Sequence, residues 1–247
     1  MSLSSPQKSG WERLYQYRAS KLLTPEFACC CFGEVSFKMG EAISTLQSCL
    51  MELKPLVWLD YRLAILFTVA IPLVLLVWAA FKRSEAISRL LIIYWRVASL
   101  LAIAVYLMIP AWSIAFITGF VARILIPISL WFWVDLNEEI EDRPNDGLKL
   151  ATTAWRWAVS AYCILGALAS IPFLSCAFTQ NPASVSSCRA WLEVPWAYYR
   201  LIHYDADYSN VGIIAFLGAT ALCAYIVYFF YFLLIRLGKQ GRSALER

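Results

Sequence analysis

The sequence is poor in charged residues and contains a single histidine. Charged side chains make up 15% of its 247 residues, whereas apolar side chains make up 61%. A water-soluble domain of this size could not enclose so much apolar surface in one core. One histidine excludes a haem held by two histidines of this chain, and no cysteine pair has the spacing of a zinc site. We therefore expect a lipid-solvated chain with no metal, no cofactor and no nucleic-acid partner.

Long apolar runs are what the sequence has instead. A hydrocarbon core of about 30 Å requires about 20 apolar residues per helix. Five runs meet this requirement, at residues 63–81, 88–109, 112–134, 152–174 and 211–235. Tryptophan and tyrosine gather near their ends, where such rings lie at the level of the lipid headgroups. The pattern predicts an all-α fold, a polytopic membrane bundle with about five transmembrane helices.

Lysine and arginine indicate the orientation of these helices. If the C-terminus is cytoplasmic, that side holds Lys82, Arg83, Arg89, Arg143, Lys149, Arg236, Lys239, Arg242 and Arg247. From Met51 onward, the opposite side holds only Lys54, Arg62, Arg189 and Arg200. Because cytoplasmic loops are rich in basic residues, we expect the N-terminus outside and the C-terminus in the cytoplasm.

Residues 1–50 differ from the rest of the chain. They contain no spanning run and no cleavable signal pattern. Two interpretations remain open: a disordered extension, or a segment that precedes a native start at Met51. We accordingly divide the chain into this extension and a transmembrane domain at residues 51–247.

The loop between the fourth and fifth runs contains two cysteines, Cys176 and Cys188, twelve residues apart. In the expected orientation they face an oxidising compartment, so we predict a disulfide that contributes about 3 kcal/mol. The later part of the loop, residues 190–202, is aromatic but too interrupted to span. We expect a short helix lying at the outer membrane surface.

Three arginines lie within the apolar runs. Arg96 precedes Pro110 by fourteen residues and Arg123 follows it by thirteen, which places both about 20 Å below the outer boundary. Arg156 lies seven residues beyond Lys149, about 10 Å from the cytoplasmic boundary, which is the same level. The spacing predicts a layer of three guanidinium groups.

An arginine at this depth is costly unless it faces partners or the membrane surface. The nearest carboxylates belong to the acidic loop that follows the third run, at Asp135, Glu138, Glu139 and Asp142. We expect these groups to lock helices together with the arginines. A site for an anionic headgroup or carboxylate ligand is the second interpretation, and arginines that reach toward the surface are the third.

The same acidic loop resembles an element of intramembrane proteases that process prenylated proteins. Glu138-Glu139-Ile140-Glu141-Asp142-Arg143 matches their Glu-Glu-x-x-x-Arg pattern, and His203 to Asp207 is similar to their His-x-x-x-Asp element. Such enzymes use a second histidine, which this chain lacks. The expected topology also places Glu138 and His203 on opposite faces of the membrane. We therefore assign no catalytic residue.

From Met51 onward, three stretches resemble a cyanobacterial family of multi-pass membrane proteins with no assigned function. They are Trp58-Leu59-Asp60-Tyr61-Arg62, Tyr94-Trp95-Arg96-Val97-Ala98-Ser99-Leu100, and Arg123 to Pro127 continuing from Trp131 to Asp142. The resemblance implies a thylakoid or plasma membrane of a photosynthetic bacterium. It brings no catalytic residues.

These observations favour a non-enzymatic auxiliary, assembly or scaffold component of a photosynthetic or respiratory membrane. Its expected partners are the lipid bilayer and a larger membrane protein complex. The alternative is a small transporter or anionic-lipid-binding protein built around the arginine layer, and an intramembrane hydrolase is third. A water-filled path along the arginines would favour transport, whereas arginines satisfied by carboxylates and carbonyls would favour a scaffold.

Overall fold

The computed structural model describes residues 54–202 and 211–236. The chain divides into two units, residues 1–42 and 43–247, and every described residue belongs to the second. The expectation for residues 1–50 therefore lies outside the described residues, and so does His203.

The described residues form helices and no strand. Five of these helices are long and apolar enough to cross a membrane: Lys54–Phe81, Glu85–Met108, Ile114–Trp131, Gly147–Phe178 and Val211–Ile235. The predicted all-α fold with five spans is thus confirmed. The first span begins well before residue 63. Its helix also includes residues that precede the apolar run, among them the charged residues Asp60 and Arg62.

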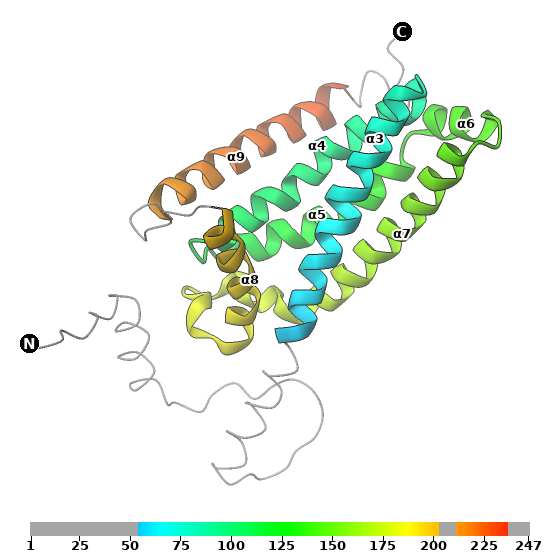
Figure 1. Ribbon diagram of the computed structural model, residues 1–247. Coiled ribbons are helices and arrows are strands. Elements are labelled where there is room, and N and C mark those ends of the chain that lie inside the picture. Colours follow the sequence, from blue (N-terminus) through cyan, green and yellow to red (C-terminus); the bar gives the residue numbers. More distant parts are fainter. Residues whose placement is uncertain (1–53, 203–210, 237–247) are drawn as a thin grey trace, which may run out of the picture. The chain divides into compact units, whose positions relative to one another are not determined.

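The centre of the bundle is the helical hairpin of α4 (Glu85–Met108) and α5 (Ile114–Trp131). Helix α7 (Gly147–Ser170) packs on α5, and α9 (Val211–Tyr231) packs on α4. The first span ends in α3 (Ile71–Phe81), which contacts both α4 and α7. Toward residue 54 this span diverges from α4, and α8 (Ser186–Ile202) lies at the open end (Figure 1).

Most of residues 135–146, which we expected to form an acidic loop, belong to the helix α6 (Val134–Asp142). Leu136 and Ile140 are one helical turn apart and are fully buried against the bundle. Glu138, Glu139 and Asp142 lie on the exposed face. The loop interpretation missed this apolar pair because the acidic residues around it dominate the composition.

The first span contains a π-helix, η1 (Ile65–Ala70), which ends two residues before Pro72. The N–H of Ile71 bonds to the carbonyl of Leu66, which leaves the carbonyl of Phe67 to accept from Trp155 Nε1 at 2.9 Å. Proline has no N–H, and the carbonyl of Thr68 accepts instead from the Tyr94 hydroxyl at 2.8 Å. Side chains of α4 and α7 thereby satisfy backbone groups that the helix itself leaves open.

Two of the turns between spans have the same geometry. Arg83 and Ala111 both adopt a left-handed backbone, with φ of 51° and 59°. In the first turn the N–H of Ser84 bonds to the carbonyl of Ala79, and in the second the N–H of Trp112 bonds to that of Leu107. These bonds form Schellman motifs, and the chain reverses within three residues between α3 and α4 and within five between α4 and α5.

Candidate functional site

A salt bridge between Asp60 and Arg123 lies inside the bundle. Asp60 comes from the first span and Arg123 from α5, and Nη2 of Arg123 donates to Oδ2 of Asp60. Their side chains are only 18% and 9% exposed. Because a guanidinium does not lose its proton in a protein, a buried arginine requires an acceptor of this kind. Sequence analysis did not identify Asp60 as this partner, because Asp60 precedes the apolar run.

Helix α7 supports the salt bridge with three residues. The Tyr162 hydroxyl lies 2.9 Å from Oδ1 of Asp60, to which it donates, and Nη1 of Arg123 lies 3.4 Å from Ser170 Oγ. Gly166 lies under the guanidinium, where a Cβ atom would overlap Nη1 and lie 3.1 Å from Cζ of Arg123. The absence of a side chain at Gly166 therefore makes room for the ion pair.

A cavity of about 440 Å³ lies beside the ion pair, and Asp60 and Arg123 form part of its wall. The first span, α4, α5, η2 (Ile171–Phe178) and α8 all contribute lining residues. Most of the wall is apolar, and its polar groups are few. Pockets that bind small molecules typically have a volume of about 300–1,000 Å³, an apolar lining and a few placed polar groups. This cavity has all three properties.

One flank of the cavity is open. Ile65 and Val69 on the first span are each 43% exposed, and Ser99 and Ala102 face them from α4 as further exposed lining residues. These two helices are apolar and long enough to span a membrane. Where these two helices span a membrane, the opening between them faces the bilayer.

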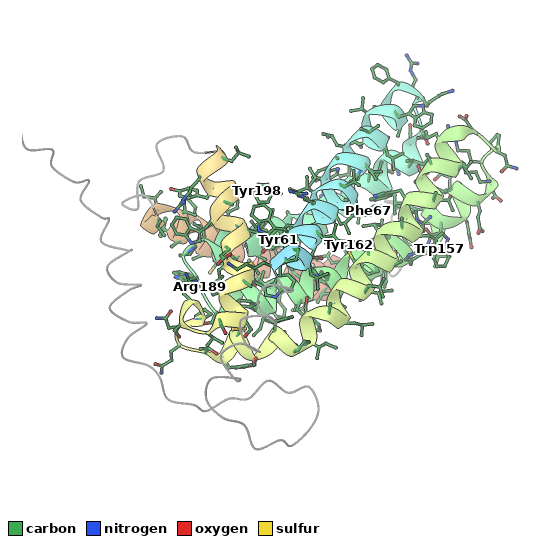
Figure 2. All side chains as sticks on the ribbon, turned by 60° about the horizontal axis from the view of Figure 1, so that its bottom comes forward. Tyr61, Phe67, Trp157, Tyr162, Arg189 and Tyr198 are labelled. Carbon is green, nitrogen blue, oxygen red and sulfur yellow. A yellow bond between two sulfur atoms is a disulfide. The ribbon has the colours of Figure 1, made fainter. Side chains whose placement is uncertain are left out.

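Aromatic rings surround the polar end of the cavity. The Trp191 ring lies 6.3 Å from the ring of Tyr61 and 5.5 Å from that of Phe173, and the Arg123 guanidinium carbon lies 5.8 Å from Trp191. Tyr198, also on α8, lies 6.2 Å from Trp58 of the first span. Figure 2 shows Tyr61 and Tyr198 together where α8 meets the first span, and Tyr162 farther along, between that span and α7.

Helix α8 is attached to the bundle at several points. Cys176 and Cys188 are joined by a disulfide, the pairing that the sequence predicts. A salt bridge of 3.1 Å joins Lys54 to Glu193, and the Tyr61 hydroxyl lies 3.4 Å from the carbonyl of Trp191. The aromatic end of the cavity is therefore closed by a segment with covalent and polar attachments.

The other two arginines of the expected layer have partners of their own. Arg156 is buried, donates to the carbonyl of Leu130 at 2.9 Å and to Asn137 Oδ1 at 2.6 Å, and stacks 4.2 Å above the ring of Trp131. Arg96 is exposed, and its Nη1 lies 3.1 Å from the hydroxyl of Tyr228 on α9. In these contacts the three arginines share no partner, and only Arg123 lines the cavity. Their common depth stays a prediction.

The acidic residues that we expected to pair with the arginines lie on α6. Glu138, Glu139 and Asp142 are exposed there, and Asp135 is partly buried in the first turn. The carboxylate that pairs with Arg123 is Asp60, on a different helix from any of these. The expected link between Arg123 and the cytoplasmic carboxylates is therefore replaced by a link to the first span.

Fold and site together define a helical membrane-type protein with five span-length helices and an internal ion pair beside an apolar cavity. The chain belongs to the family described as "Protein of unknown function (DUF3177)", whose model matches residues 54–245. This match supports the expected membership in a family without an assigned function. No curated protein and no solved structure matches the chain.

Proposed function

We propose that the protein is a non-enzymatic membrane protein that holds a lipid-soluble molecule in the cavity beside Asp60 and Arg123. The cavity is the observation that carries this proposal, since its volume, apolar wall and few polar groups are those of a ligand site. Its open flank between the first span and α4 gives a bilayer molecule a direct route of entry. Asp60 and Arg123 neutralise each other, which suits binding better than proton transfer.

The binding role agrees with the auxiliary or assembly function that the sequence favours. In this proposal the protein serves a larger complex of a photosynthetic or respiratory membrane by holding such a molecule. The resemblance to a cyanobacterial family supports a thylakoid or plasma membrane. The disulfide supports an oxidising compartment at α8, and hence an outer N-terminus and a cytoplasmic C-terminus.

The proposal can be tested by filling the cavity. Ala102 is an exposed lining residue of α4, so the Ala102→Trp variant places an indole in the opening. Ala154 on α7 is also exposed but is not among the lining residues of the cavity, and Ala154→Trp is therefore the matched control. Each protein is purified from native membranes in mild detergent, and its bound lipids and pigments are identified by mass spectrometry.

We expect a molecule in near-stoichiometric amount with the wild type and Ala154→Trp, and its loss with Ala102→Trp at an unchanged melting temperature. Equal amounts in all three proteins would overturn the proposal, and so would a wild type that carries no molecule after purification from its own membrane.

A further inference from the structure

We infer that the ligand of this cavity is a neutral molecule with a flat, oxygen-bearing ring and an apolar tail. This inference rests on the proposed binding function and adds the chemical class of the ligand. It follows from three properties of the cavity wall: its charge, the arrangement of its aromatic rings, and the position of its opening.

The charge of the wall selects against an anion. Arg123 is a cation in the lining, but the Asp60 carboxylate is bonded to it and lines the same cavity. An anionic headgroup that approached the guanidinium would also approach this carboxylate, at a site with little water to screen the repulsion. A neutral headgroup meets no such repulsion.

The ion pair nevertheless leaves hydrogen-bonding capacity for a neutral oxygen. An arginine has five N–H donors, and the described contacts of Arg123 use one toward Asp60 and one toward Ser170. A carbonyl or hydroxyl oxygen of the ligand would accept from the guanidinium. The polar end of the cavity thus provides a donor group without a net charge.

The rings at this end favour a flat headgroup over a simple chain. Tyr61, Phe173 and Trp191 all line the cavity, with Trp191 next to both other rings and to Arg123. Aromatic rings gain additional stabilisation when they pack against another ring in an offset or edge-on arrangement. A ring that carries an oxygen would contact these side chains and the guanidinium at once.

The remainder of the cavity suits an apolar tail. Away from the ion pair, the wall includes the small and aliphatic side chains of Ile65, Val69, Ala98 and Ala102, together with the ring of Trp95. The opening lies among these residues, so a tail would extend from the cavity into the surrounding hydrocarbon. The headgroup end and the tail end of the ligand are therefore assigned by the structure of the wall.

The test compares three probes that share ten-carbon chains. They are 2-decyl-1,4-benzoquinone, which is neutral with a ring, didecanoylglycerol, which is neutral without one, and didecanoyl phosphatidylglycerol, which is anionic. Affinity is measured on delipidated wild-type protein in detergent from the concentration dependence of the melting temperature. We expect saturable binding of the quinone, at least tenfold tighter than that of either other probe, and loss of all binding in Ala102→Trp.

A second variant tests the role of charge. In Asp60→Asn the wall acquires the uncompensated charge of Arg123, so the affinity for the anionic probe relative to that for the quinone should rise at least tenfold. If this variant does not fold, the relative affinities of the wild type for the three probes decide whether the inference holds. Tighter binding of either glycerolipid than of the quinone by the wild type would overturn the inference but leave the proposed function intact. Binding of no probe, together with a wild type that carries no native molecule, would remove both.

Discussion

The pairing of Asp60 with Arg123 predicts unequal effects when either partner is replaced. Asp60→Asn keeps the size of the side chain and an acceptor for Tyr162, but it leaves a buried guanidinium that cannot lose its charge. Breaking a buried pair in this way costs about 3–5 kcal/mol. For a chain of this size that corresponds to a fall in melting temperature of about 6 °C or more, at roughly 2–4 °C per kcal/mol.

The opposite replacement should cost less. Arg123→Met removes the cation and leaves Asp60, whose carboxylate retains the hydrogen bond from Tyr162 and is less buried than the guanidinium. The double variant Asp60→Asn/Arg123→Met contains no unpaired charge. It should therefore recover part of the stability that Asp60→Asn alone loses, with a coupling energy of about 1–3 kcal/mol.

Thermal unfolding of the four proteins in one detergent measures this cycle. Arg96→Met is the matched control, because Arg96 is exposed and its guanidinium donates to the uncharged hydroxyl of Tyr228, and the replacement should change stability by less than about 0.5 kcal/mol. Two additive losses in the double variant would refute the argument. So would an Asp60→Asn protein that melts at the wild-type temperature.

Three further predictions follow from the contacts around the site. Gly166→Ala should destabilise the bundle by about 1–3 kcal/mol, since the methyl group overlaps the fixed guanidinium, and the loss should vanish in an Arg123→Met background. Cys176 and Cys188 should resist alkylation in intact membranes until they are reduced, and reduction should lower stability by about 2–4 kcal/mol; free thiols before reduction would contradict this. Arg156→Lys should lower the melting temperature by an amount equivalent to about 1.5–3 kcal/mol, because an ammonium cannot reproduce the two hydrogen bonds and the stacking; an unchanged melting curve would show that these contacts are dispensable.

The spans could be predicted from the sequence because hydrophobic length is a local property. Each run of about 20 apolar residues predicts a helix by itself, independently of the segments that pack against it. The helix α6 could not be recognised in this way, since its burial depends on only two side chains, Leu136 and Ile140, within an acidic segment. The local composition of this segment predicts exposure to solvent, whereas packing against the bundle buries these two side chains.

The partner of Arg123 depended on geometry that no local pattern contains. The expected depth of Arg123 predicts a need for an acceptor, but the acceptors that we expected for it were carboxylates on the cytoplasmic side. Asp60 lies six residues into the first span, about 9 Å along its axis, and Arg123 lies nine residues into α5, about 14 Å along its own. Both distances are measured from the same end of the bundle. A comparison of these two depths would have indicated Asp60 as a partner of Arg123. The roles of Gly166 and Tyr162 could not be predicted from the sequence, because both residues act through contacts with Asp60 and Arg123.

The π-helix η1 sets the direction in which Asp60 points from the first span. Each residue of an α-helix advances the direction of its side chain by about 100°. A turn of π-helix accommodates one residue more than an α-helical turn, so η1 changes the rotational phase between α3 and the residues before Ile65. If the segment were α-helical and α3 kept its packing, Asp60 would point about 100° away from its present direction, and Arg123 would face a different side chain. Asp60 contacts Arg123 because of the π-helix η1, which begins more than one helical turn after Asp60. Because the π-helical turn contains one additional residue, deleting one residue within 65–70 should restore an α-helical turn and keep Asp60 facing Arg123, whereas forcing the same six residues into an α-helix would separate the pair.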